Sequence, residues 1–263
     1  MKIKFQKFHG ASNDFVIIDG HFLEKITSAA IKRICDRKRG VGADGLIFVS
    51  KPKGKNVIFK FFNSDGNEAD FCGNGLRCAT MFCKLNYGIS DVLFKTNSGI
   101  CSTKFVSRKK ILVEVPVNIK AQKIRFSGKT LFFCDTGVPH TVIIVKNLKD
   151  IDVEKKGKII RWHDFFSPAG TNVDFVEIIS ENKIFLRTYE RGVEGETDAC
   201  GSGACASALS LAIFANLQFP IDVITKSSDT LRIYLPEGKN KDNTDKLFLE
   251  GPAEFSFRGE VEI

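Results

Sequence analysis

Two cysteines of this 263-residue chain lie in matching glycine-rich segments. The segments read Cys72-Gly73-Asn74-Gly75 and Cys200-Gly201-Ser202-Gly203. A polar loop precedes each cysteine and an apolar run follows it, over residues 76–85 and 204–217, which predicts a helix that begins at each C-G-x-G. A thiol at a helix N-terminus lies at the positive end of the helix dipole, so we expect a lowered pKa and a reactive thiolate there. The glycines would leave backbone N–H groups open to a substrate carboxylate.

Such a pair of thiols could invert a carbon centre. Racemisation of an amino acid needs one group to remove the Cα proton from one face and another group to supply a proton on the opposite face. A thiolate accepts a proton and a thiol donates one, so Cys72 and Cys200 could fill both roles. The helix N-termini would stabilise the charge that builds up on the substrate carboxylate. We therefore predict a cofactor-independent amino-acid epimerase.

Other chemistries find less support in the sequence. It holds no G-x-G-x-x-G after a strand, no Walker A motif and no signature for pyridoxal phosphate, so no cofactor is expected. Cys72, Cys78 and Cys83 leave a zinc-binding interaction module open as an alternative. Their spacing is not C-x-x-C and no histidine lies nearby in the sequence, so we expect no metal.

The segments around these cysteines predict a sheet-rich fold. Strand-like runs, rich in β-branched and aromatic residues, occupy 15–18, 46–49, 57–62, 111–115 and 141–145. Helical segments are fewer: Ser28 precedes one at 29–37, and two more begin at the glycine-rich segments. The pattern predicts an α/β or α+β protein with much sheet and few helices.

An internal repeat organises these elements. Cys72 and Cys200 are 128 positions apart, and five further pairs match at the same offset. The pairs are Gly42 and Gly170, Glu68 and Glu196, Asp70 and Asp198, Gly73 and Gly201, and Gly75 and Gly203. We therefore predict two similar halves, 1–117 around Cys72 and 118–251 around Cys200.

Charge and the N-terminal sequence bear on partners and location. The net charge of +8 is scattered along the chain without a nucleic-acid-binding motif. We therefore expect no nucleic-acid partner, and a carboxylate substrate suits the same charge. The N-terminus lacks the apolar segment of a signal peptide, and no apolar run approaches the roughly 20 residues of a membrane span. We expect a cytoplasmic protein with no membrane partner, whose eight cysteines are reduced.

The sequence resembles the diaminopimelate epimerase family, which interconverts LL- and meso-diaminopimelate. Both cysteine segments carry the resemblance, together with residues 8–15, 40–45 and 170–175, and it extends over nearly the whole chain. It implies two pseudo-symmetric domains, each a mostly antiparallel sheet wrapped around a central helix, with the active site in the cleft between them. It also implies a homodimer, a C-terminal strand near 252–263 that returns to the first domain, and a role in lysine and peptidoglycan precursor synthesis.

The resemblance implies a role for each candidate site residue. Cys72 and Cys200 would form the acid/base pair, with His140 and Glu190 assisting their proton balance. The reacting carboxylate would be bound by donors of the two cysteine segments, namely Gly73, Asn74, Gly201 and Ser202. The rest of the amino-acid substrate, including its distal end, would be held by Asn13, Asn63, Asn172, Glu190 and Arg191.

Two positions depart from the family pattern. Val138 stands where the Gly-x-Pro-His turn usually has Asn, and Gly45 stands where some members carry Gln. The missing Asn removes a polar group expected near the distal end of the substrate. We therefore expect relaxed substrate specificity.

Two other proteins of this fold remain as alternative interpretations. Another two-cysteine racemase, of the glutamate or proline type, would share the mechanism. Proline-type enzymes resemble C-G-H-G at the first cysteine, however, where this chain has C-G-N-G. A non-catalytic isomerase-like binding protein, related to phenazine-biosynthesis proteins, would generally lack the cysteine pair.

Overall fold

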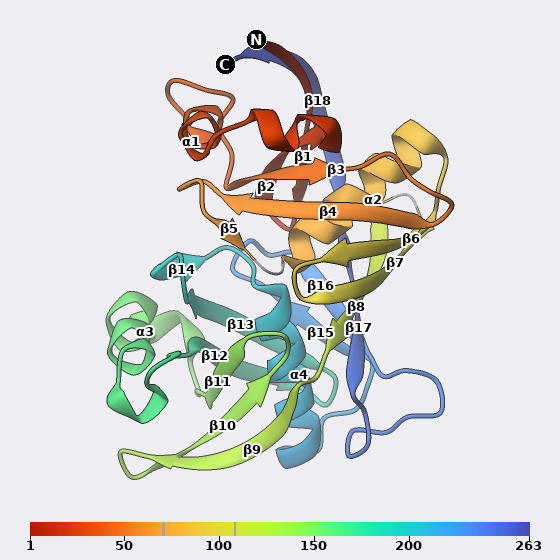
Figure 1. Ribbon diagram of the computed structural model, residues 1–263. Helices are drawn as coiled ribbons and strands as arrows, with labels where there is room; N and C mark the ends of the chain where they lie inside the picture. Colours follow the sequence, from red (N-terminus) through yellow and green to blue (C-terminus); the bar gives the residue numbers. More distant parts are fainter. Residues whose placement is uncertain (70–71, 108) are drawn as a thin grey trace. The chain divides into compact units, whose positions relative to one another are not determined.

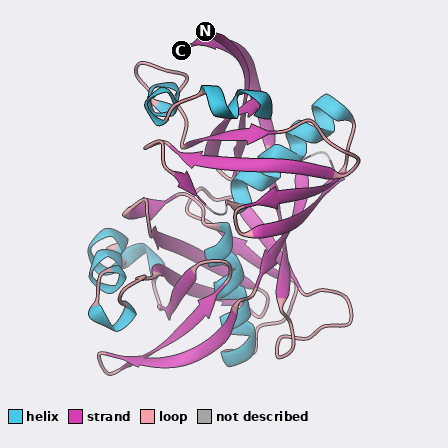
Figure 2. Cartoon of the chain, in the orientation of Figure 1, coloured by secondary structure: helices cyan, strands magenta, loops and turns pink. Residues whose placement is uncertain are grey.

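The computed structural model describes residues 1–69, 72–107 and 109–263 (Figure 1). Asp70, one of the repeat positions, lies outside the described residues. The chain folds as two compact units, unit 1 formed by Met1–Val113 with Gly251–Ile263, and unit 2 formed by Glu114–Glu250. Strands dominate the secondary structure of both units (Figure 2), which confirms the predicted sheet-rich α/β class. In the described part of the chain, no helix is long and apolar enough to cross a membrane.

Unit 1 is a mostly antiparallel sheet with the strand order β18-β1-β2-β3-β4-β6-β7-β8. The pairs β2–β3 and β4–β6 are parallel. Its strands are β1 (Lys2–Gly10), β2 (Asn13–Asp19), β3 (Gly45–Val49), β4 (Asn56–Asn63), β5 (Glu68–Ala69), β6 (Asp91–Thr96), β7 (Gly99–Ser107), β8 (Lys110–Pro116) and β18 (Glu254–Glu262). Its helices are α1 (Ser28–Cys35), α2 (Gly73–Tyr87) and the 3₁₀ helix η1 (Gly20–Lys25).

Unit 2 repeats this topology, with the strand order β9-β10-β11-β12-β13-β15-β16-β17. The parallel pairs, β11–β12 and β13–β15, fall at the equivalent places. Its strands are β9 (Ile119–Phe126), β10 (Lys129–Asp135), β11 (Pro139–Ile144), β12 (Asn172–Ser180), β13 (Lys183–Glu190), β14 (Gly195–Thr197), β15 (Ile221–Ile224), β16 (Thr230–Tyr234) and β17 (Lys246–Pro252). Its helices are α3 (Val153–Arg161), α4 (Gly201–Phe214) and the 3₁₀ helices η2 (Leu148–Asp150) and η3 (Asp164–Phe166).

Each sheet wraps around one central helix. Residues 74–83 of α2 and residues 203–212 of α4 are all buried, so neither helix keeps a solvent face along these stretches. A helix that is buried on every side belongs to the core. The strands of unit 1 contact α2 from several directions, and those of unit 2 contact α4 in the same way. Gly, Ala and Ser fill much of α4, and their small side chains let the strands approach the helix closely.

The helices begin where local chemistry satisfies their free N–H groups. Both C-G-x-G segments start a helix, as predicted, and α2 ends at Gly88, which adopts the left-handed conformation (φ 72°). The predicted cap of the first helix was wrong by one residue. Thr27, not Ser28, precedes α1, because Thr27 is extended and its hydroxyl accepts a hydrogen bond from the Ala30 N–H.

Candidate active site

Cys72 caps the N-terminus of α2 in unit 1. Its backbone is extended (φ −148°, ψ 102°), and its Sγ accepts a hydrogen bond from the Gly75 N–H at 3.3 Å. The thiol is half-buried, so the side chain is neither locked in the core nor fully exposed. A sulfur held by the first turn of a helix is stabilised as a thiolate by these N–H groups.

Asn13 and Asn74, two predicted substrate-binding residues, meet in unit 1. Asn74 is 5% exposed and donates from Nδ2 to Asn13 Oδ1 at 3.2 Å. Its Oδ1 accepts from Arg77 Nη2 at 2.8 Å, and Asn13 Nδ2 donates to Asp44 Oδ2 at 2.8 Å. The amide groups beside Cys72 are therefore held in fixed orientations by an arginine on one side and an aspartate on the other.

A partly exposed ion cluster fixes the strand that carries Asn13. Asp14 pairs with Lys7 Nζ at 2.8 Å and accepts two hydrogen bonds from Arg37, which also contacts Asp44. Burial alone would raise the pKa of Asp14, but the hydrogen bonds from Arg37 and Lys7 outweigh it and lower the pKa to about 2. This cluster was not predicted from the sequence, although Asp44 lies in segment 40–45, one of those that resemble the family.

Asn63, the third candidate of unit 1, ends β4 next to the turn that leads to β5. Its N–H donates to Asn67 O, and its C=O accepts from the Gly66 N–H, both at 2.9 Å. The hairpin that follows brings the chain back toward the start of α2. Asn63 is half-buried, so its side chain is partly accessible.

Cys200 caps α4 in unit 2, in an environment unlike that of Cys72. The residue is only 6% exposed, and its Sγ lies 3.5 Å from Ser202 Oγ. Burial raises the pKa of the Cys200 thiol well above its usual range, and the negative charges of Glu190 and Asp174 add to the effect. The contacts with the Ser202 hydroxyl and the Gly203 N–H lower the pKa but do not compensate. The predicted lowered pKa is therefore wrong for Cys200, because desolvation exceeds the helix-dipole effect.

A chain of polar side chains leads away from Cys200. Ser202 Oγ lies 2.9 Å from His140 Nε2, and His140 Nδ1 lies 2.7 Å from Asp174 Oδ2. Asp174 Oδ1 in turn accepts a hydrogen bond from Thr188 Oγ1 at 2.7 Å. The His140 and Asp174 side chains are fully buried. Sequence reasoning singled out His140 and Ser202, but it assigned no role to Asp174 or Thr188.

Asn172 ties together two loops of unit 2. It is 3% exposed, its Nδ2 donates to Pro139 O at 3.0 Å, and its Oδ1 accepts from the Arg191 N–H at 2.8 Å. The Arg191 guanidinium donates to Ala169 O at 3.2 Å, and Glu190 Oε2 accepts from Thr197 Oγ1 at 2.9 Å. The structure thus brings Asn172 and Arg191 together, and Asn172 positions the backbone from which Arg191 projects.

Most of the remaining cysteines are buried thiols in hydrophobic surroundings. Burial raises the pKa of Cys35, Cys83 and Cys134 to about 12, and it raises that of Cys78 further. These thiols are protonated and unreactive at neutral pH. Among the residues that the structure describes, no three or more His, Cys, Asp or Glu side chains gather as a metal ion would require.

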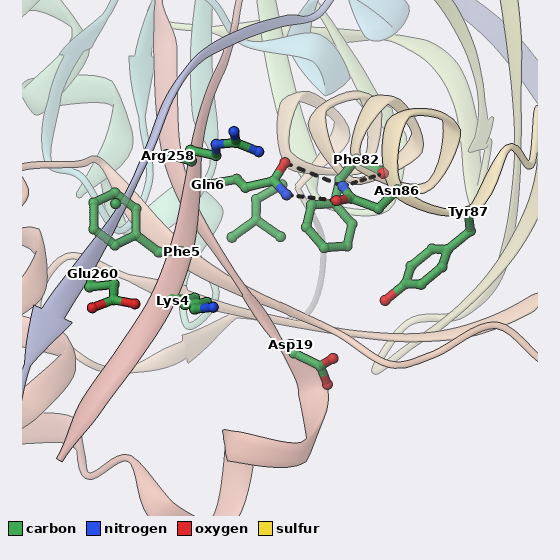
Figure 3. Close-up of a pocket in the computed structure, with 11 residues that line it drawn as sticks. Lys4, Phe5, Gln6, Asp19, Phe82, Asn86, Tyr87, Arg258 and Glu260 are labelled. Atoms are coloured by element: carbon green, nitrogen blue, oxygen red, sulfur yellow. Dashed lines mark hydrogen bonds between the residues drawn. The ribbon is translucent and has the colours of Figure 1, made fainter.

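A hollow of about 560 Å³ on unit 1 lies away from these groups (Figure 3). Its lining includes Lys4, Asp19 and Arg258, and its floor holds Gln6 and Asn86, which exchange amide hydrogen bonds. It contacts the C-terminal end of α2, whereas Cys72 caps the N-terminal end. None of the candidate residues lines it, so this hollow is not the candidate site.

The fold places this chain in a class of two-unit α/β proteins that includes epimerases. A hydroxyproline epimerase from Agrobacterium vitis superimposes with a TM-score of 0.72 at 11% identity, over 99% of this chain and 91% of that one. A PhzF-family phenazine biosynthesis protein from Bacillus anthracis gives a TM-score of 0.74 at 15% identity, with complete coverage of both. At these identities the likeness concerns the fold alone.

Sequence comparison then identifies the family. The diaminopimelate epimerase profile matches residues 5–117 and 132–255. The diaminopimelate epimerase of Hydrogenobaculum sp. is 37% identical, with 96% of each chain covered, and that of Aquifex aeolicus is 37% identical, with 98% of each covered. The chain belongs to the diaminopimelate epimerase family. The resemblance to this family is confirmed, and so is the prediction that the protein is an isomerase.

Proposed function

We propose that this protein interconverts LL- and meso-diaminopimelate by moving one Cα proton between Cys72 and Cys200, without a bound cofactor. Family membership supports the substrate, because the relatives named as diaminopimelate epimerases match nearly the whole chain. The chemistry rests on one observation: two units of the same topology each carry a cysteine at the N-terminus of the buried central helix.

The reaction needs one thiolate and one thiol, on opposite faces of the substrate Cα. The raised pKa of Cys200 favours the thiol as its resting form, so Cys200 would act as the acid in the first proton transfer. Cys72, half-buried and held by the Gly75 N–H, would act as the base. After one turnover the two roles are exchanged, and the enzyme is ready for the reverse reaction.

The start of each central helix supplies donors for the substrate carboxylate. Gly73 and Asn74, and Gly201 and Ser202, form the first turns of α2 and α4, where the backbone N–H groups lie at the positive end of the helix dipole. Such groups bind a carboxylate and stabilise the charge that grows on it as the Cα proton leaves. Asn13, Asn63, Asn172, Glu190 and Arg191 would bind the remaining parts of diaminopimelate.

The setting of the activity is also part of the proposal. A diaminopimelate epimerase serves lysine and peptidoglycan precursor synthesis, which would place the protein in the cytoplasm. We also propose that it is a homodimer. Light scattering tests the assembly, since a dimer has twice the 29.2 kDa mass of one chain.

The decisive experiment follows the Cα proton in deuterium oxide. Early in the reaction, a two-base enzyme places solvent deuterium in the newly formed meso-diaminopimelate but leaves the recovered LL-substrate unlabelled. A single-base enzyme would return the abstracted proton and would label the product only partly. A product that retains the substrate's proton would contradict the two-cysteine mechanism, and the absence of any epimerisation would contradict the proposed function.

A further inference from the structure

Asp174 is a fully buried carboxylate whose two oxygens face two polar groups. Its Oδ2 lies 2.7 Å from His140 Nδ1, and its Oδ1 accepts from Thr188 Oγ1 at 2.7 Å. A buried carboxylate is costly unless hydrogen bonds satisfy it. These two contacts meet that requirement, on the strand next to the one that carries His140.

The carboxylate dictates which nitrogen of His140 carries the proton. An ionised carboxylate can only accept hydrogen bonds, so the facing Nδ1 must be protonated. In the neutral imidazole, Nε2 is then an acceptor. The hydroxyl of Ser202, 2.9 Å from Nε2, donates to it and turns its oxygen lone pairs to the Cys200 thiol at 3.5 Å. In the row of side chains Cys200, Ser202, His140 and Asp174, each group therefore donates a hydrogen bond to the next one.

We propose that Asp174 is a positioning residue of this epimerase, which holds His140 as the Nδ1–H tautomer so that Cys200 exchanges its proton with His140 through Ser202. This inference rests on the proposed function, in which Cys200 alternates between thiol and thiolate. His140 then accepts the proton that Cys200 releases when the thiol becomes a thiolate. Cys200 is 6% exposed and has little contact with water, which favours an acceptor inside the protein.

The proton transfer balances within the chain. The Cys200 S–H bond breaks and its electron pair stays on sulfur, while the proton joins Ser202 Oγ. The Ser202 hydroxyl gives its original proton to His140 Nε2. The products are a thiolate, an intact serine hydroxyl and an imidazolium that faces the Asp174 carboxylate. The net charge of the group is unchanged, and nothing is oxidised or reduced.

Among the ionisable groups around His140 and Cys200, Asp174 stabilises the imidazolium and Glu190 opposes the thiolate. Asp174 faces it from β12, Cys134 is its partner across the β10–β11 pair, and Cys200 lies beyond Ser202 at the start of α4. Glu190 at the end of β13 bears on Cys200, where its charge opposes the thiolate. Asp174 is therefore the acid group that stabilises a positive charge on His140 directly.

Unit 1 has a different residue at the equivalent place. Leu46 stands 128 positions before Asp174, in β3, and it cannot accept a hydrogen bond. In unit 2, a Cβ at Gly203 would lie 2.5 Å from Asp174 Oδ1 and 3.3 Å from Cys200 Sγ. The second glycine of the C-G-S-G segment thus leaves space for the carboxylate behind the cysteine.

The tautomer of His140 can be measured without any activity assay. Nitrogen-15 NMR of protein labelled at its four histidines separates Nδ1–H from Nε2–H, and His140→Gln identifies the signal. We expect the Nδ1–H form in the wild type. In Asp174→Asn we expect a mixed tautomer and protonation of His140 at lower pH, because the imidazolium loses its carboxylate. An Nε2–H tautomer in the wild type would overturn the proposal whether or not the variant folds.

A double-mutant cycle tests the relay in turnover. Asp174→Asn and Ser202→Ala should each lower kcat for diaminopimelate about 10- to 100-fold, with KM of Asp174→Asn within about twofold of wild type. Because Asp174 acts through Ser202, the double variant should be no slower than Ser202→Ala alone. Multiplied losses would mean an independent, structural role and would overturn the proposal. If the proposed function were wrong, the wild type would not epimerise diaminopimelate. The tautomer measurement would still show whether His140 faces Asp174 as the Nδ1–H form.

Discussion

At the residue scale, the two candidate cysteines occupy the same place in the fold but different surroundings. Cys72 is half-buried, whereas Cys200 is 6% exposed and lies beside a serine, a histidine and an aspartate. Burial raises the pKa of the Cys200 thiol, so these surroundings favour its protonated form. The proposed racemisation needs one thiol and one thiolate at the start of each turnover.

Removing either cysteine should abolish epimerisation. We expect Cys72→Ala and Cys200→Ala each to lower kcat about 10²- to 10⁴-fold, because neither thiol can reach the face that the other serves. Cys35→Ala and Cys101→Ala are matched controls and should retain activity, since these cysteines are buried in unit 1 and belong to neither C-G-x-G segment. Circular dichroism should show intact folds. Near wild-type turnover by either active-site variant would be incompatible with two-thiol catalysis.

Val138 should set the specificity for the distal end of the substrate. Its side chain cannot hydrogen-bond, so the distal carboxylate of the proposed substrate would lack one donor. A hydrogen bond from a neutral donor to a charged acceptor contributes roughly 1.5–3 kcal/mol to the binding free energy. We expect diaminopimelate to remain the best substrate, and L-glutamate to be epimerised slowly. Val138→Asn should raise the ratio of kcat/KM for LL-diaminopimelate to that for L-glutamate. An unchanged ratio, or no glutamate turnover by the wild type, would refute this role.

At the element scale, two buried helices are held in place by what packs at their first turns. In unit 2, Gly203 lies against Asp174 and Cys200, so the start of α4 has no space for a side chain there. In unit 1, Asn74 is clamped by Asn13 and Arg77, and the strand that carries Asn13 is tied down by the Asp14 cluster.

Gly203→Ala should disturb the active site more than the fold. Its Cβ would lie 2.5 Å from Asp174 Oδ1, so either the carboxylate or the helix must shift, at a cost of about 1–3 kcal/mol in unfolding free energy. We expect kcat to fall by at least tenfold. Gly195→Ala is the control, because the nearest atom to its Cβ would be Glu154 Oε1 at 3.5 Å. Equal behaviour of the two variants in urea unfolding and in turnover would exclude this packing argument.

The Asp14 cluster should make stability depend on acid pH. The pKa of Asp14 falls from 3.8 to about 2 on folding. Its stabilisation is therefore complete above pH 4 and is lost as pH falls toward 2. A shift of this size corresponds to about 2 kcal/mol. We expect Asp14→Asn to lose that amount at pH 7 by urea unfolding, and the difference from wild type to shrink by pH 3.

A surface ion pair provides the control for Asp14. Asp91 lies 3.4 Å from Lys55, and both side chains are exposed. Asp91→Asn should change the unfolding free energy by less than ~1 kcal/mol at either pH, since exposed ion pairs contribute little. A pH-independent loss in Asp14→Asn would show that packing, and not ionisation, accounts for its effect.

At the scale of the whole molecule, unit 1 is built from both ends of the chain. β18 pairs with β1 from Lys2 to His9, and Arg77 Nε donates to Pro252 O at 3.0 Å (Figure 1). The N-terminal half therefore completes its sheet only when the C-terminal segment has been made. Unit 2, in contrast, is formed by one continuous stretch of chain.

Truncation after Pro252 should unfold unit 1 selectively. Loss of β18 exposes β1 along its length, so the buried thiols Cys35, Cys78 and Cys83 should become reactive toward a thiol reagent. Cys134 and Cys205 of unit 2 should stay protected, and epimerase activity should be lost. Removal of Ile263 alone is the control and should leave all five thiols protected. Protected unit 1 thiols in the long truncation would mean that β18 is dispensable.

The sequence alone determined the features that depend on neighbouring residues. The C-G-x-G segments start helices because their glycines and caps act within one turn, and the apolar runs after them predicted the helices that follow. The matching residues 128 positions apart predicted two similar halves, and the motifs around the two cysteines indicated the family. Five strand-like runs located β2, β3, β4, β8 and β11, since their pattern of side chains is also local.

Only the tertiary structure decided how the site is tuned. His140, Asp174 and Ser202 come from β11, β12 and the start of α4, and no local pattern links positions 34 and 62 residues apart. The pKa of Cys200 was mispredicted for the same reason, because the helix dipole acts locally whereas desolvation depends on every element packed around the thiol. The proposed proton transfer depends on both, so the sequence could name Cys72 and Cys200, whereas the direction of the Cys200 pKa shift required the tertiary structure.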